Sequence, residues 1–209
     1  MKLSSVEQSK FDAGRCTLTF ENGEKLKTFM SVVADMGLYS GMELDGEELD
    51  ALKNASRTMG AKARAARIAG AAPVSRAQLV KKLKEKGETE ADAENAADWL
   101  ENIGAVSDAD YAEMLVRNLS ARGYGKARIR QKLREKGVPR ELWDEALAQM
   151  PESDEALEKY IRAHLDENET DRKKIKKVSD ALLRRGFSWS EVSEALAKVT
   201  SGDNCSSED

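Results

Sequence analysis

Basic side chains recur at helical spacing near the middle of the chain. They form two rows in which neighbours lie four residues apart, Lys126–Arg130–Arg134 and Arg128–Lys132–Lys136. Residues at this spacing share one face of a helix, so each row predicts a strip of like charges beside an apolar stripe. Like charges repel there, so the strips need negative counterparts. Two sources stay open: acids on a neighbouring helix of the same protein, or an anionic partner.

Other residue types that could support chemistry are sparse. The single histidine, His164, has no cysteine or serine companion at a recognisable spacing, so we expect no nucleophilic catalysis. Residues 123–125, Gly-Tyr-Gly, are not followed by a Gly-Lys-Ser/Thr element, which favours a turn between helices. Cys16 and Cys205 lack metal-ligand spacing, and the acids show no calcium-loop pattern. The sequence predicts no catalytic residue, no metal and no cofactor.

Composition favours an array of helices with much exposed surface. Of the 209 residues, 34% are charged and 40% hydrophobic, and only 3 are proline. The net charge of −4 argues against indiscriminate binding to nucleic acid. The start of the chain lacks an apolar segment of signal-peptide length, and the sequence has no apolar run long enough to cross a bilayer. We therefore expect a cytoplasmic protein that does not associate with membranes.

The near-neutral total conceals strongly segregated charge. Residues 62–86, 117–136 and 172–185 hold eight, eight and seven basic side chains, each stretch with a single acid. Acids dominate between these stretches, as in residues 88–113. This segregation predicts basic helices that alternate with acidic ones.

An internal repeat of about fifty residues explains that alternation. Each copy places two apolar residues and a glycine at successive intervals of four: Leu79, Leu83, Gly87; Ile129, Leu133, Gly137; Val178, Leu182, Gly186. The apolar pair marks one helix face, and the glycine suits the left-handed position that ends a helix. The pattern extends to Ala61, Tyr111 and Tyr160 upstream and to Leu100, Met150 and Val199 downstream. Each repeat is thus predicted to have three helices.

A small β-structure precedes the repeats. Residues 15–29 alternate apolar and polar side chains around an Asn22-Gly23 turn, which predicts a hairpin. A short helix over residues 31–36 should follow, ended by Gly37. Asp45 and Glu48 then form a capping box for a long helix that reaches about residue 70.

The predicted fold is all-α: three tandem three-helix repeats in an elongated curved array, with a small N-terminal β-hairpin and helix. Trp99, Trp143 and Trp189 all fall in third helices, where we expect them to pack in the core or between repeats, with stacking on bases as the alternative. The expected segments are a disordered N-terminus (1–13), the hairpin and short helix (14–48), repeat 1 (49–104), repeat 2 (105–151), repeat 3 (152–199) and a disordered acidic tail (200–209).

The string Arg-Gly-Tyr-Gly-Lys-Ala-Arg-Ile-Arg-Gln-Lys-Leu at 122–133, followed by Glu-Lys-Gly-Val at 135–138, strongly resembles the central repeat of the RecX family. Residues 75–87 and 181–187 look like the first and third repeats of that family. The resemblance implies a bacterial regulator of DNA recombination, repair and the SOS response that acts without catalysis. It implies binding in the groove of the RecA filament on DNA and damping of RecA's ATPase, strand-exchange and coprotease activities.

The basic helices are the expected contact surface, presented along a common ridge. Three repeats that each contact the filament would add their affinities through multivalency. The candidate partner-binding residues are Arg122, Lys126, Arg128, Arg130, Lys132, Arg134, Lys81, Lys82, Lys173, Lys176 and Lys177. Changing Arg128 and Arg130 to glutamate is expected to relieve RecA inhibition. The alternative function is direct binding of nucleic acid by the same helices, and in either case we expect a monomer.

Overall fold

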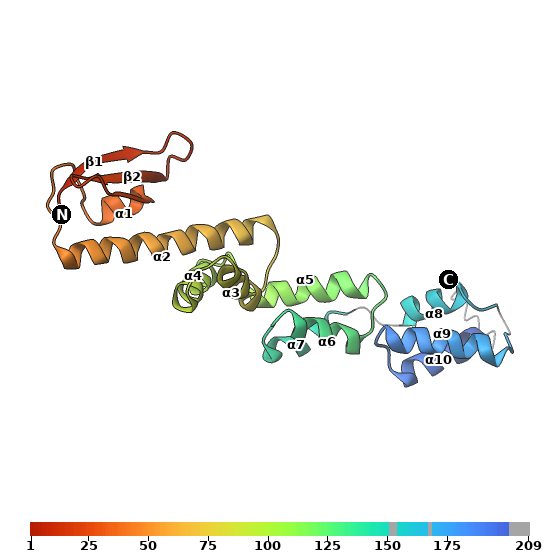
Figure 1. Cartoon of the computed structure of the whole chain (residues 1–209). Helices are drawn as coiled ribbons and strands as arrows, with labels where there is room; N and C mark the ends of the chain where they lie inside the picture. Colours follow the sequence, from red (N-terminus) through yellow and green to blue (C-terminus); the bar gives the residue numbers. More distant parts are fainter. Residues whose placement is uncertain (151–153, 167–168, 201–209) are drawn as a thin grey trace, which may run out of the picture. The chain divides into compact units, whose positions relative to one another are not determined.

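The computed structural model describes residues 1–150, 154–166 and 169–200 (Figure 1). It divides into two compact units, one from Met1 to Val106 and one that begins at Ser107. Four separate hydrophobic clusters lie along the chain, one for the N-terminal sheet and one for each three-helix repeat. Each repeat therefore buries its own apolar residues, as the fifty-residue period predicts.

The first unit opens with a three-stranded antiparallel sheet of strands β1 (Leu3–Gln8), β2 (Arg15–Phe20) and β3 (Lys25–Phe29). The predicted hairpin is β2–β3, and Gly23 in its turn has a φ of 83°. The prediction of disorder over residues 1–13 is wrong for β1. Leu3 is fully buried opposite Phe20, and pairing with β2 holds a strand whose own sequence is mostly polar.

Helix α1 (Met30–Asp35) follows the sheet, and Gly37, with a φ of 61°, closes the turn after it, as predicted. Asp45 and Glu48 form the predicted capping box for α2 (Gly46–Ala71). The first half of α2 packs its buried Leu52 against the sheet. The second half packs Ala61 and Ala65 against α3 (Arg76–Glu85) and α4 (Glu90–Asn102) to form the first repeat.

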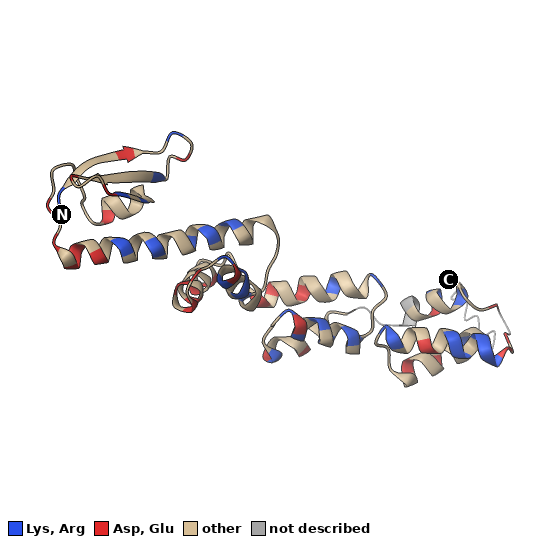
Figure 2. Cartoon of the chain, viewed as in Figure 1, with Lys and Arg blue, Asp and Glu red and all other residues tan. Residues whose placement is uncertain are grey.

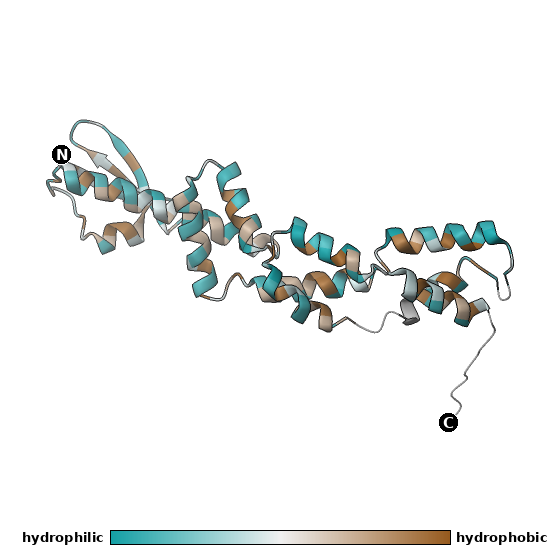
Figure 3. Ribbon diagram, turned by 90° about the horizontal axis from the view of Figure 1, so that it is seen from below, coloured by the Kyte–Doolittle hydropathy of each residue, from teal (hydrophilic) through white to brown (hydrophobic). Residues whose placement is uncertain are grey.

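The second unit contains the other two repeats. The second repeat consists of α5 (Asp108–Ser120), α6 (Lys126–Glu135) and α7 (Trp143–Ala148), with the 3₁₀ turn η1 (Arg140–Leu142) leading into α7. The third consists of α8 (Asp154–Arg162), α9 (Arg172–Arg184) and α10 (Trp189–Thr200). Hydrophobic residues gather on the helix faces that pack together within each of these two repeats (Figure 3). The tail predicted to be disordered lies outside the described residues beyond Thr200, as does Cys205, whereas Cys16 is a buried free thiol.

The glycines of the repeat pattern end the second helix of each repeat. Gly87, Gly137 and Gly186 have φ angles of 91°, 71° and 91°, the left-handed conformation predicted for them. Ser75 and Ser188 cap the helices that follow them.

A backbone joint connects the second and third repeats. The N–H of Gly125, before α6, donates to the carbonyl of Arg185 at 2.9 Å, and the N–H of Ala127 donates to the carbonyl of Gly186 at 3.1 Å. A Cβ on Gly125 would lie 2.4 Å from the Gly186 oxygen, and one on Gly186 would lie 2.3 Å from the Arg128 nitrogen. Both positions are therefore restricted to glycine by the approach of the two backbones.

This joint replaces a side-chain cap. At the equivalent position of the first repeat, the Ser75 hydroxyl accepts from the N–H of Gln78 at 3.2 Å. Gly125 has no side chain, and α6 has no side-chain cap. The carbonyls of Arg185 and Gly186, at the end of α9, accept hydrogen bonds from the first N–H groups of α6 instead. The negative end of the α9 dipole thereby lies against the positive end of the α6 dipole. The Gly-Tyr-Gly segment is an inter-helix turn, as predicted, and it also joins two repeats.

Candidate partner-binding surface

The predicted contact residues lie on or just before the second helix of each repeat. Lys81 and Lys82 are on α3, Arg122 precedes α6, five more residues lie on α6, and Lys173, Lys176 and Lys177 are on α9. Basic side chains follow α6 and α9 (Figure 2). Most of them are exposed, whereas Arg128 and Lys132 are half-buried.

One of the two rows on α6 is engaged within the protein. Arg128 donates to Gln131 at 2.7 Å and lies beside Gly186 in the joint. Lys132 pairs with Glu135 at 2.6 Å, and that hydrogen bond lowers the pKa of the Glu135 carboxyl. Changing Arg128 to glutamate would remove its hydrogen bond to Gln131 as well as a surface charge, so the more exposed Arg130 and Arg134 are better positions for testing partner contact.

Two residues of the other row, Arg130 and Arg134, line a pocket of about 480 Å³ between α6, η1 and α7. Three arginines, Arg130, Arg134 and Arg140, converge on it, together with Ala127, Trp143 and Asp144. Arg140 is not among the residues predicted from sequence, because it lies outside the basic helix. Its position directly after Pro139, where a new helix begins, was the only signal that could have placed it beside α6.

Trp143 forms the apolar wall of this arginine pocket. It is 8% exposed, and its Nε1 donates to the Val138 carbonyl at 3.0 Å, which orients the ring. The Arg134 guanidinium lies 5.9 Å from the ring centroid, within range of a cation–π interaction. Trp143 thus packs in the core, as predicted, and also holds one arginine of the pocket in place.

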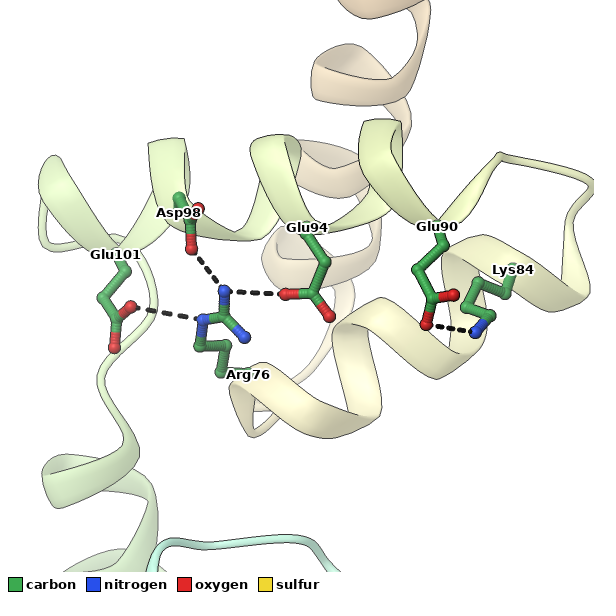
Figure 4. A network of polar contacts seen from close by, with 6 residues as sticks. All are labelled: Arg76, Lys84, Glu90, Glu94, Asp98 and Glu101. Carbon is green, nitrogen blue, oxygen red and sulfur yellow. Dashed lines mark hydrogen bonds and ion pairs between the residues drawn. The ribbon is translucent and has the colours of Figure 1, made fainter.

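In the first repeat, two basic residues of α3 pair with acids of α4. Arg76 on α3 pairs with three acids of α4: Glu94 at 2.8 Å, Glu101 at 3.4 Å, and Asp98 (Figure 4). The hydrogen bonds to Asp98, above all, and to Glu94 raise the pKa of Arg76. Lys84 pairs with Glu90 at 2.8 Å and lowers the pKa of that carboxyl. Here the counterpart of the basic helix is the acidic helix beside it.

Replacing Arg76 with alanine should lower the free energy of unfolding of the first unit by about 1 kcal/mol, because partly exposed ion pairs are screened by solvent. Without Arg76, three acids of α4 repel one another, and added salt screens that repulsion. The loss in free energy of unfolding should therefore be smaller at high salt. Urea unfolding in low and high salt measures this. Lys81→Ala on the same helix is the control, and equal losses at both salt concentrations would contradict the electrostatic origin.

In the third repeat, the residues equivalent to Lys84 and Glu90 of the first repeat are apolar and exposed. Trp189 is 62% exposed and Leu183 is 38% exposed. The prediction that the tryptophans pack in the core or between repeats is wrong for Trp189, which is the first residue of α10 and lies outside the hydrophobic cluster of the third repeat. Trp99 is half-buried against the first-repeat cluster, with Lys62 located 5.6 Å from its ring centroid.

Side chains of the types that bind metal ions are dispersed among the described residues. No three His, Cys, Asp or Glu side chains gather there in an arrangement that could hold a metal ion. His164 is exposed, stacks on Tyr160 with ring centroids 4.2 Å apart, and contacts the Tyr160 carbonyl through Nδ1 at 2.8 Å. Within residues 1–150, 154–166 and 169–200, each helix is too short or too polar to cross a bilayer.

The fold and this surface define a class: a protein of tandem three-helix repeats, each with a basic second helix, preceded by a small sheet. Residues 107–147 match the second three-helix domain of RecX, and residues 154–196 match its third three-helix domain. The regulatory protein RecX of Limosilactobacillus reuteri is 30% identical over 196 residues, which cover 90% of this chain and 73% of that protein. The chain belongs to the RecX family.

Other relatives extend the match to nearly the whole chain. The regulatory protein RecX of Clostridium acetobutylicum is 27% identical over 212 residues, covering 97% of this chain and 98% of that protein. A crystal structure of regulatory protein RecX superposes with a TM-score of 0.76 at 26% identity, covering 97% of this chain and 99% of the other. The RecX structure from Lactobacillus salivarius shares the fold, with a TM-score of 0.61 at 20% identity over 69% of this chain and 97% of that one.

Proposed function

We propose that this chain binds the RecA filament assembled on DNA and modulates RecA, mostly by inhibiting its recombinase, ATPase and coprotease activities. Membership of a family of regulatory proteins supports this role. The observation that carries it is the exposed arginine row of α6, within the string that resembles the central RecX repeat. Unlike the first repeat, the second leaves this row without strong internal partners.

The electrostatics of that row favour an external anion. Arg130 has one ion-pair partner among the described residues, Asp144 at 3.6 Å, whose side chain is 91% exposed. A pair so exposed contributes about 0–1 kcal/mol, so it competes weakly with a partner. Arg134 has no carboxylate of the described residues within ion-pair distance. Two guanidinium groups on one helix face therefore remain available for contact.

The test is cosedimentation with preassembled RecA filaments, followed by titration of their ATPase. The wild-type chain should pellet with filaments and lower the ATPase rate. Arg130→Glu with Arg134→Glu should weaken both effects at least about tenfold, because reversing charges at an interface opposes association. Lys25→Glu with Lys27→Glu on β3 changes the net charge equally and should bind as the wild type does. Wild-type binding that needs no RecA, or unchanged binding by the α6 variant, contradicts the proposal.

Direct binding of nucleic acid is the second candidate function. The exposed Lys173, Lys176 and Lys177 on α9 favour it, because such a row could neutralise backbone phosphates. This affinity would persist without RecA and would fall steeply with rising salt. Filament binding would instead require RecA, nucleotide and DNA together, so parallel titrations with and without RecA separate the two functions.

A further inference from the structure

Equivalent positions in the three repeats carry three different chemistries. The positions held by Arg134 and Arg140 in the second repeat are occupied by Lys84 and Glu90 fifty residues earlier. The first repeat closes this site with its own ion pair at 2.8 Å. The third repeat has Leu183 and Trp189 there, both exposed. Only in the second repeat do both positions carry positive charge.

The arginine pocket therefore holds uncompensated charge. The acid that neutralises this site in the first repeat has been replaced by Arg140, and no carboxylate among the described residues lies within ion-pair distance of Arg134 or Arg140. The pocket's own acid, Asp144, contacts only Arg130, at 3.6 Å. Three guanidinium groups converging on one hollow repel one another unless an anion lies between them.

We propose that this pocket binds the carboxylate of an acidic side chain on the partner protein. The proposal rests on the proposed function, and it identifies which group the second repeat recognises. In the first repeat, Glu90 pairs with Lys84. The bound carboxylate would take the place of Glu90 in the second repeat and pair with Arg134, the counterpart of Lys84. Guanidinium groups suit it because their planar fork matches two carboxylate oxygens.

A carboxylate fits this site better than a nucleic-acid phosphate. The pocket is a local hollow with an apolar wall, Trp143, and an acid, Asp144, in its lining. A single carboxylate needs only the three arginines, and it can displace Asp144 because that side chain is 91% exposed. A phosphate strand would bring further negative charges past Asp144, in a protein whose net charge is already −4.

Arg140→Glu tests the proposal by building the first repeat's ion pair into the second. The new carboxylate would pair with Arg134 and occupy the site from within. The variant should fold with an unchanged thermal midpoint but bind RecA filaments at least about tenfold more weakly. Arg117→Glu, on α5 of the same repeat and outside the pocket, is the control with an equal change of charge. Wild-type affinity for Arg140→Glu, or an equal loss in both variants, overturns the pocket as the contact.

A second measurement keeps the pocket testable if the wild-type chain fails to bind RecA filaments. With Trp99 and Trp189 replaced by phenylalanine, Trp143 reports on the pocket through its fluorescence. A hexaglutamate peptide should change this signal, inorganic phosphate and a single-stranded oligonucleotide should change it less, and Arg140→Glu should abolish the response. That result upholds the pocket even where the proposed function fails. A stronger response to phosphate or oligonucleotide, or a response to none of the three, overturns it.

Discussion

Replacing Gly186 with alanine is expected to destabilise the second unit by about 3 kcal/mol or more, among the larger effects of a single substitution. Two costs combine at this position. The residue has a φ of 91°, which any L-residue adopts at a cost of about 1–2 kcal/mol. The added Cβ would also lie 2.3 Å from the Arg128 nitrogen and would push the turn after α9 away from α6. The Ala127–Gly186 hydrogen bond would then be lost.

Gly87→Ala is the matched control for this prediction. Gly87 occupies the equivalent position in the first repeat, has the same φ of 91°, and has nothing within 4 Å of an added Cβ. It should show the backbone cost alone, about 1–2 kcal/mol. Urea unfolding gives the two losses, and hydrogen exchange at Gly125 and Ala127 reports the joint directly. Equal losses for the two variants, or unchanged protection at Ala127 in Gly186→Ala, would show that the joint contributes nothing.

Leu133→Ala is expected to cost about 2–5 kcal/mol, because it leaves a cavity in the core of the second repeat. Leu133 is fully buried in a cluster with Ile129, Trp143 and Leu147. No member of that cluster belongs to the first unit, so the amides of α2 and α4 should keep their protection while those of α6 exchange faster.

Leu183→Ala is the comparison for this second prediction. Leu183 lies one position beyond the equivalent of Leu133 in the third repeat and is 38% exposed. Its truncation should therefore cost less than about 1 kcal/mol. Circular dichroism during urea unfolding, with residue-resolved exchange, makes the comparison. If Leu133→Ala lowered the protection of α2 as much as that of α6, the two units would unfold together and the prediction of separate cores would be contradicted.

The difference between repeats suggests how one architecture acquires different surfaces. Arg76 and Lys84 pair with acids of α4 in the first repeat, whereas Arg134 and Arg140 line an open pocket in the second. The helices that carry these residues are alike, so the change lies in a few side chains. The resulting division is between a repeat whose Arg76 and Lys84 pair with their own acids and a repeat that leaves three arginines around an open pocket.

Local signals in the sequence determined most of the helices. The apolar pairs at Leu79–Leu83 and Ile129–Leu133, the glycines after them, and the Asp45 capping box predicted where helices begin and end. Such signals act over one or two turns, so they can be read without knowing the fold. The three-helix repeats followed because the same signals recur at a fixed period.

Contacts between distant segments were decided only by the tertiary structure. Strand β1 forms through pairing with β2, although its own sequence is mostly polar. Arg140 reaches the α6 row because η1 folds back beside that helix, and Gly125 meets Gly186 because two repeats approach at backbone distance. Composition and spacing describe what each segment prefers by itself. The side chain or carbonyl that faces a segment depends on packing across the fold, which no local pattern encodes.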